Sequence, residues 1–226
     1  MIELINSDCL DVMEQMVYTD GLQVDCIITD PPYGMSFVSS RRKEKYKAIK
    51  NDDNLEWLDR FVDASYKLLK NNRHAYFFCS WHHVDKFKQA LEKKFNVKNI
   101  LIWEKNNHGS GDLKGDYAPQ YEMIIYCQKG RRELNGHRES NILKFQKTDN
   151  ELHPTQKPVG LIDFILRKSV NKGELVFDPF AGSGTTGKAA IIEECDFIGI
   201  EIDEAFYQVS KDGLLNQQNE KENSLF

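Results

Sequence analysis

The sequence predicts an α/β fold in which a mostly parallel sheet is covered by helices on both faces. Apolar, strand-like runs alternate with amphipathic helical segments along most of the 226 residues, the pattern of strand–helix–strand units. The strands expected at 97–103 and 120–127 are joined by a connection too short for a helical crossover, so this pair should run antiparallel. The content of 40% hydrophobic and 29% charged residues is that of an ordinary globular protein.

Seven strands are expected, each ending where apolar residues give way to polar or turn-forming ones. Helices with apolar residues at three- and four-residue spacing are expected between them. The predicted strands cover 1–6, 24–30, 74–79, 97–103, 120–127, 174–178 and 197–201. The first predicted helix starts after Ser7 or Asp8, either of which can cap it. The other predicted helices cover 54–69, 84–95, 159–170, 187–194 and 204–215.

The domain organisation follows from the absence of any linker or internal repeat in the sequence. Residues 1–226 are expected to form a single domain. The stretches 35–54 and 128–152 lack periodicity and are expected to be loops. The polar tail 216–226 is expected to fray.

Composition argues against several classes of protein. No run reaches the ~18 apolar residues of a membrane span, and the N-terminus lacks the basic and apolar regions of a signal peptide. Five cysteines without Cys-x-x-Cys spacing indicate reduced thiols in a cytoplasmic protein. Adjacent His82 and His83 lack a suitably spaced acidic or cysteine partner, so no metal is expected. The net charge of −5 is not that of a protein basic all over, but it allows a local basic patch.

The first chemical motif is the turn that ends the second predicted strand. The strand must stop at Pro31 and Pro32, because neither residue has an N–H for the sheet ladder. The tip then carries the Asp30 carboxylate, the Pro31 carbonyl and the Tyr33 ring. A flat ligand could stack on Tyr33 while its amino group donates to Asp30 and to the Pro31 carbonyl. The alternative is a plain Pro-Pro turn capped by an aspartate.

The second motif is a glycine turn, Gly182-x-Gly184-x-x-Gly187, between a strand and a helix. Glu201 follows Gly182 by nineteen residues, which matches a dinucleotide-binding fingerprint. A phosphate loop is disfavoured because Ala189 stands where that motif needs Ser or Thr. The acidic Asp178 just before the glycines is a poor neighbour for a pyrophosphate but a good one for a cationic ligand. Since Glu201 could bind two ribose hydroxyls, S-adenosylmethionine fits this turn.

A basic stretch follows the first motif. Residues 41–50 carry six positive side chains and one negative one, with Tyr46 among them. A solvated surface loop and a flexible arm for a polyanion are both consistent with this composition. The residues expected to contact phosphates are Arg41, Arg42, Lys43, Lys45 and Lys47.

Together the two motifs resemble the amino-methyltransferases of DNA, which methylate the exocyclic amine of adenine (N6) or cytosine (N4). The motif order, with the catalytic turn before the cofactor turn and 153–158 leading into the cofactor half, resembles the β group of this family. The resemblance implies a Rossmann-like, S-adenosylmethionine-dependent methyltransferase fold that acts on double-stranded DNA, in a bacterium or its phage. Adenine is expected to be the target because the turn begins with Asp, and the base should flip out of the duplex. A cytosine-N4 enzyme and a catalytically silent homologue are the alternatives.

The resemblance also assigns roles to residues. The catalytic turn would be Asp30, Pro31, Pro32 and Tyr33. Asp8 and Cys9 would lie at the cofactor adenine, and Thr155 and Lys157 near its carboxylate. The stretch 128–152 is shorter than the usual target-recognition region, so 35–54 or the second subunit of a homodimer would contribute to recognition. The remaining cofactor contacts would come from Asp178, Pro179, Phe180, Ala181, Gly182, Ser183, Gly184, Thr185 and Glu201.

Overall fold

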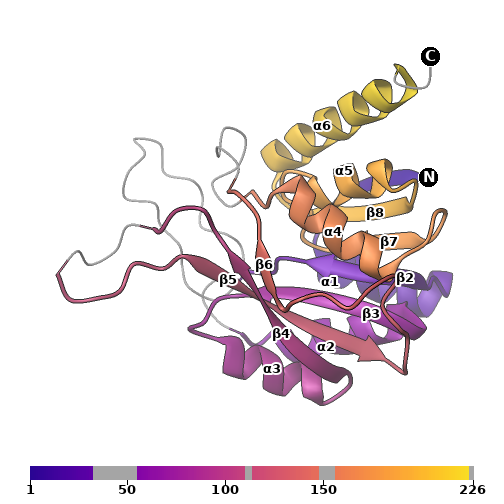
Figure 1. Cartoon of the computed structure of the whole chain (residues 1–226). Coiled ribbons are helices and arrows are strands. Elements are labelled where there is room, and N and C mark those ends of the chain that lie inside the picture. Colours follow the sequence, from indigo (N-terminus) through magenta and orange to yellow (C-terminus); the bar gives the residue numbers. More distant parts are fainter. Residues whose placement is uncertain (33–54, 110–113, 148–155, 224–226) are drawn as a thin grey trace.

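Eight strands form one mixed sheet in the computed structural model, which describes residues 1–32, 55–109, 114–147 and 156–223 (Figure 1). Their order across the sheet is β1-β8-β7-β2-β3-β5-β4-β6. Among these strands β5 alone runs against its neighbours, β3 and β4, which confirms the predicted antiparallel pair. The strands are β1 (Ile2–Asn6), β2 (Val24–Thr29), β3 (Leu69–Cys79), β4 (Asn96–Glu104), β5 (Tyr121–Lys129), β6 (Ile142–Lys144), β7 (Leu175–Asp178) and β8 (Asp196–Glu201).

Helices cover both faces of the sheet, as predicted, because successive strand residues point to opposite sides (Figure 1). On β3, Phe77 belongs to one apolar core and the next residue, Phe78, to the other. The first core is closed by α1 (Cys9–Gln15), the π-helical turn η1 (Met16–Asp20), α2 (Leu58–Leu68) and α3 (Val84–Glu92). The second is closed by α4 (Val159–Ser169), α5 (Thr185–Ile192) and α6 (Glu204–Asn223).

The prediction of seven strands was wrong by one short strand, β6. It pairs in parallel with β4 at the edge of the sheet, and Leu143 is its buried residue. The Trp103 indole N–H donates to the Phe145 carbonyl at 2.9 Å, which ties the end of β6 to β4. Three residues are too few for a strand period to stand out in a sequence, so this pairing is a tertiary effect.

The last helix is also longer than predicted: the sequence predicts an end at residue 215, whereas α6 continues to Asn223. Only Ser210 and Leu214 of this helix are buried, so apolar burial does not explain its length. The Lys221 ammonium donates to the carbonyls of Ile191 and Ile192 at the end of α5. That contact, together with the high helix propensity of Gln, Glu and Lys, supports the last turns.

The topology brings the carboxyl ends of β2 and β7 together at the centre of the sheet. These strands are neighbours, with Cys26 opposite Val176. The connection from β2 leads to β3 on one side, whereas the connection from β7 leads to β8 on the other. Such a reversal is the place where open α/β sheets bind ligands. No helix within the described residues is long and apolar enough to span a membrane.

Candidate active site

Asp30 lies at the tip of β2, in the centre of the sheet. All six residues of β2 are buried, and the strand ends before Pro31 and Pro32, as the two prolines predict. The Asp30 side chain is 24% exposed, so its carboxylate faces the edge of the sheet where a ligand could reach it. Pro31 is buried. Tyr33, the last member of the predicted catalytic turn, lies outside the described residues.

Lys157 contacts the Asp30 carboxylate, although the two residues are 127 positions apart. Its ammonium donates to Asp30 Oδ2 and lies 3.1 Å from Glu122 Oε2. The Lys157 side chain is 9% exposed. Burial alone would lower the pKa of Lys157, but the charges of Asp30 and Glu122 raise it above its ordinary value. Lys157 is therefore a buried cation between two carboxylates.

Glu122 belongs to the site but was missed by the sequence analysis. Its other oxygen, Oε1, lies 2.7 Å from the Lys105 ammonium. Burial would raise the pKa of Glu122, yet Lys157 and Lys105 hold it below its ordinary value. A signal was present in the sequence: because β5 runs antiparallel, its first residues lie at the same edge as the last residues of β2.

Asp178, at the tip of β7, stabilises the glycine turn from inside. Asp178 is only 4% exposed. Oδ2 accepts a 2.6 Å hydrogen bond from the Thr186 hydroxyl, and Oδ1 accepts one from the Phe180 N–H at 3.1 Å. Burial raises the pKa of Asp178 to about 6 despite these two donors. The carboxylate thus stabilises the turn through hydrogen bonds, whereas the sequence alone suggests a direct partner of a cationic ligand.

Glu201, at the tip of β8, lies at the same edge of the sheet and accepts hydrogen bonds from two loops. Oε2 accepts from the Gly182 N–H at 2.9 Å and Oε1 from the Asp203 N–H at 2.8 Å. Each carboxylate oxygen has two lone-pair directions, so Glu201 retains acceptor capacity for a ligand's hydroxyl groups. Burial raises the pKa of Glu201 above its ordinary value, although the two N–H donors oppose this effect.

The glycine turn needs glycine at position 184 for two reasons. Its φ is +79°, the left-handed region that other residues avoid, and a Cβ there would lie 2.3 Å from the Ser210 hydroxyl oxygen. The turn leads directly into α5, whose first residue is Thr185. The Thr185 hydroxyl is buried and has no hydrogen-bond partner in the part of the chain that the structure describes. A ligand group at this turn could supply one. Pro179, Ala181 and Ser183 of the same turn are buried, and Phe180 packs its ring against Trp57 and Phe61.

Asp8 and Cys9 follow β1, beside the tip of β8. The Ser7 N–H donates to the Glu201 carbonyl at 3.2 Å. Asp8, one of the two caps that the sequence allows, caps α1 by accepting from the Leu10 N–H at 2.9 Å. Burial raises the pKa of the Cys9 thiol to about 12, so this group is neutral and offers an apolar contact.

The structure thus collects the predicted residues of β1, β2, β7 and β8 at one edge of the sheet. Lys157, which the resemblance places near the cofactor carboxylate, lies at the same edge but contacts Asp30. Thr155 and the basic stretch with Arg41, Arg42, Lys43, Lys45 and Lys47 lie outside the described residues. Within those residues no group of three or more His, Cys, Asp and Glu side chains is arranged to hold a metal ion.

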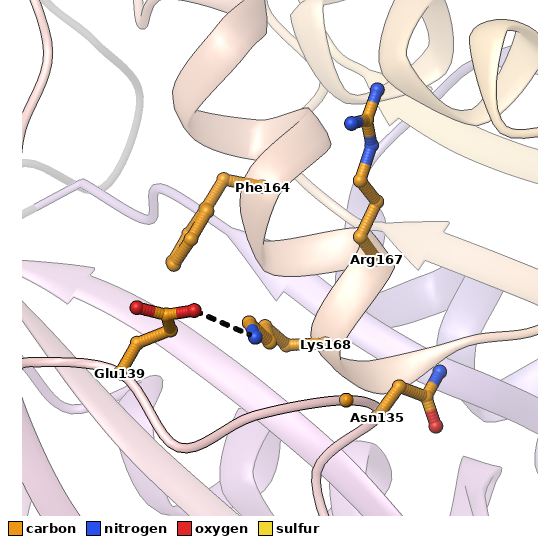
Figure 2. A pocket seen from close by; sticks show the side chains of 6 residues that line it. Asn135, Glu139, Phe164, Arg167 and Lys168 are labelled. Carbon is orange, nitrogen blue, oxygen red and sulfur yellow. Dashed lines mark hydrogen bonds and ion pairs between the residues drawn. The ribbon is translucent and has the colours of Figure 1, made fainter.

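A cavity of about 350 Å³ lies elsewhere, between the loop before β6 and the end of α4 (Figure 2). Lys168 and Glu139, which face each other across it, form an ion pair at 3.2 Å. The Asn135 N–H donates to the Lys168 carbonyl, one residue before α4 ends. Lys157 and Asp30 lie at the opposite end of this 11-residue helix, which is roughly 16 Å long. The cavity is therefore separate from the Asp30 edge. Its lining residues are Asn135, Gly136, Glu139, Phe164, Arg167 and Lys168.

Comparisons with known proteins agree with this geometry. Residues 24–212 match the N6/N4 family model described as DNA methylase. The type II methyltransferase M2.MboI of Moraxella bovis is 30% identical over 92% of this chain and 85% of its own length. The DNA adenine methyltransferase YhdJ of Escherichia coli (strain K12) is 27% identical over 88% of this chain and 79% of its own. The crystal structure of the M1.HpyAVI–SAM complex matches with a TM-score of 0.76 and 30% identity, covering 95% of this chain and 100% of that one.

Proposed function

Because the chain belongs to the N6/N4 DNA methylase family, we propose that it transfers a methyl group from S-adenosylmethionine to the N6 amine of adenine in double-stranded DNA. The observation that carries the proposal is the position of Asp30. Its carboxylate stands at the centre of the sheet, one strand away from the β7 glycine turn. Two features favour adenine: the turn begins with Asp, and the relative YhdJ is described as an adenine methyltransferase.

The residues at the glycine turn fit S-adenosylmethionine. Glu201 has acceptor capacity for two ribose hydroxyls, and the buried Thr185 hydroxyl has no partner among the described residues. The neutral, apolar Cys9 beside the Glu201 strand suits the face of an adenine ring. The similar M1.HpyAVI structure is a complex with the same cofactor, which supports this assignment. When bound, the cofactor supplies an electrophilic methyl carbon on a positively charged sulfur.

The mechanism that we propose is direct transfer. The amine of adenine is a weak nucleophile, because its lone pair is delocalised into the ring. Asp30 accepts one N–H of this amine and the Pro31 carbonyl accepts the other, which favours a pyramidal nitrogen with its lone pair directed at the methyl carbon. Holding the nitrogen in that position lowers the barrier through orientation. The new bond between nitrogen and carbon would form as the bond between that methyl carbon and its sulfur breaks, and the surplus proton on the nitrogen would then pass to water. No covalent bond to the protein is formed.

The proposal for DNA binding comes from the sequence and the chemistry. The amine is unreachable inside a duplex, so the adenine must flip out, and Tyr33 would stack on it. The basic residues at 41–50 would contact phosphates, which position the duplex without reading its sequence.

The test is a product analysis. The purified protein is incubated with S-adenosylmethionine that carries a deuterated methyl group and with genomic DNA from an unmethylated host. The DNA is then digested to nucleosides for mass spectrometry. Deuterated N6-methyladenine is expected with the wild type and none with Asp30→Ala. Deuterated N4-methylcytosine instead would overturn the base assignment. Cofactor binding without any deuterated nucleoside would identify a catalytically silent homologue.

A further inference from the structure

We propose that Lys157 and Glu122 are positioning residues, which hold the Asp30 carboxylate ionised and in one orientation for the substrate amine. The proposal rests on the proposed function, since it gives Asp30 the task of accepting an N–H from the amine. It assigns Lys157 a role different from the contact to the cofactor carboxylate that the sequence resemblance implies.

The geometry places Lys157 where it can do this. It precedes Pro158, which occupies the N-cap position of α4, so the start of a packed helix anchors its backbone. Its ammonium donates to Asp30 Oδ2, lies 3.1 Å from Glu122 Oε2 and stands 5.2 Å from the centre of the Phe78 ring. The contacts come from the residue that follows β2 and from the strands β5 and β3. A long, flexible side chain is therefore held in one place, at the carboxylate that faces the ligand edge.

The charges at this site alternate. In space, Asp30 contacts Lys157, Lys157 contacts Glu122, and Glu122 contacts Lys105, whose ammonium lies 2.7 Å from Glu122 Oε1. The exposed fractions of these four side chains lie between 9% and 26%. A buried charge is strongly unfavourable without a partner, so each member of this row depends on its neighbours. Glu122 thus keeps the Lys157 ammonium charged and in reach of Asp30.

The consequence for Asp30 is chemical. A cation in contact with a carboxylate favours its ionised form, which only accepts hydrogen bonds. A protonated Asp30 would turn an O–H donor toward an amine that is itself a donor. Because Lys157 binds Oδ2, the rotation of the carboxylate is also restricted. Lys157 therefore favours the ionised form of the acceptor that the amine meets and restricts its direction.

Two other titratable groups face Asp30 within the described residues. Cys79, at the end of β3, is neutral because burial raises the pKa of its thiol to about 12. Asp178, at the end of β7, titrates near pH 6, since burial raises its pKa to that value. Because Asp178 interacts electrostatically with Asp30, the Asp30 midpoint is read from the Asp30 carboxyl itself and not from the pH profile of kcat alone.

The experiment compares three variants with the wild type. Lys157→Met removes the charge at similar side-chain length, Glu122→Gln removes one negative charge at nearly constant shape, and Lys98→Met is a matched control at an exposed position of β4. For each protein, kcat is measured against pH on duplex DNA. The Kd for S-adenosylmethionine is measured by calorimetry, and the pH midpoint of the Asp30 carboxyl titration by carbon-13 NMR.

The expected results separate positioning from cofactor binding. Lys157→Met should lower kcat at pH 7 at least 100-fold, make it rise with pH, and move the Asp30 midpoint to higher pH, while the Kd stays within threefold. Glu122→Gln should lower kcat about threefold to tenfold at an unchanged Kd. Lys98→Met should change none of the three quantities.

Two results would overturn the proposal. The first is a Kd raised more than tenfold in Lys157→Met with a flat pH profile and an unmoved Asp30 midpoint, which would make Lys157 a cofactor ligand. The second is a Glu122→Gln variant with the same kcat and Kd as the wild type. This result would reject the proposal even if Lys157→Met does not fold. The NMR titration requires no turnover. A shifted midpoint in a protein that methylates no DNA would therefore reject the proposed function and leave the ion-pair arrangement standing.

Discussion

Replacing Glu201 by alanine tests whether the tip of β8 binds the cofactor or only supports the turn. The substitution removes two hydrogen bonds to a charged acceptor, from the N–H groups of Gly182 and Asp203. Hydrogen bonds to charged groups contribute about 1.5–3 kcal/mol each. Glu201 is partly exposed, so water replaces part of that loss. We expect the free energy of unfolding to fall by about 2 kcal/mol, which for a chain of this size lowers the Tm by about 4–8 °C.

The cofactor affinity should fall as well, and independently of folding. Loss of hydrogen bonds to the ribose should cost about 1.5–3 kcal/mol, which raises the Kd for S-adenosylmethionine roughly 10-fold to 150-fold. The assay is calorimetric titration at a temperature where the variant is fully folded, as judged by circular dichroism. Glu204→Ala, an exposed glutamate in the first turn of α6, is the matched control and should change neither quantity. A lowered Tm with an unchanged Kd would refute the reasoning, since Glu201 would then only stabilise the turn.

Three further predictions concern other parts of the molecule. Asp30→Ala should abolish methyl transfer but change the cofactor Kd less than tenfold, because the glycine turn is on another strand; a larger change in Kd would contradict the assignment. Burial lowers the pKa of His74 to about 4, so the unfolded state binds more protons between pH 4 and 6.5, and the free energy of unfolding falls as pH falls through this window. His74→Gln should remove about 3 kcal/mol of that pH dependence in urea unfolding, and an unchanged slope would show that another group causes it. Neutralising Arg41, Arg42, Lys43 and Lys45 together should weaken binding to all DNA sequences equally. It should also flatten the dependence of log K on log salt by up to ~0.9 per lost phosphate contact. Methylation of a different site would instead show that this basic stretch reads bases.

Local patterns were enough to predict most of the sheet. Val24–Thr29 is apolar or β-branched at every position except Asp25, and two prolines follow it closely. It forms the buried strand β2 that ends before Asp30. The glycine turn forms as predicted, since its left-handed positions require glycine whatever surrounds them. Element ends were less accurate. The strand β3 begins at Leu69 and not at residue 74, because pairing with β2 and β5 extends it beyond its apolar run.

The sequence by itself determined the alternation of strands and helices, the two motifs and the order in which they occur, because each depends on neighbouring residues. The tertiary structure alone decided the pairing of β6, the length of α6 and the partner of Lys157. Lys157 contacts Asp30, which is 127 residues away in the sequence, and Glu122, which belongs to the antiparallel strand β5. No local pattern encodes such a contact: it exists because β2, β5 and the start of α4 meet at one edge of the sheet, where buried charges must find one another.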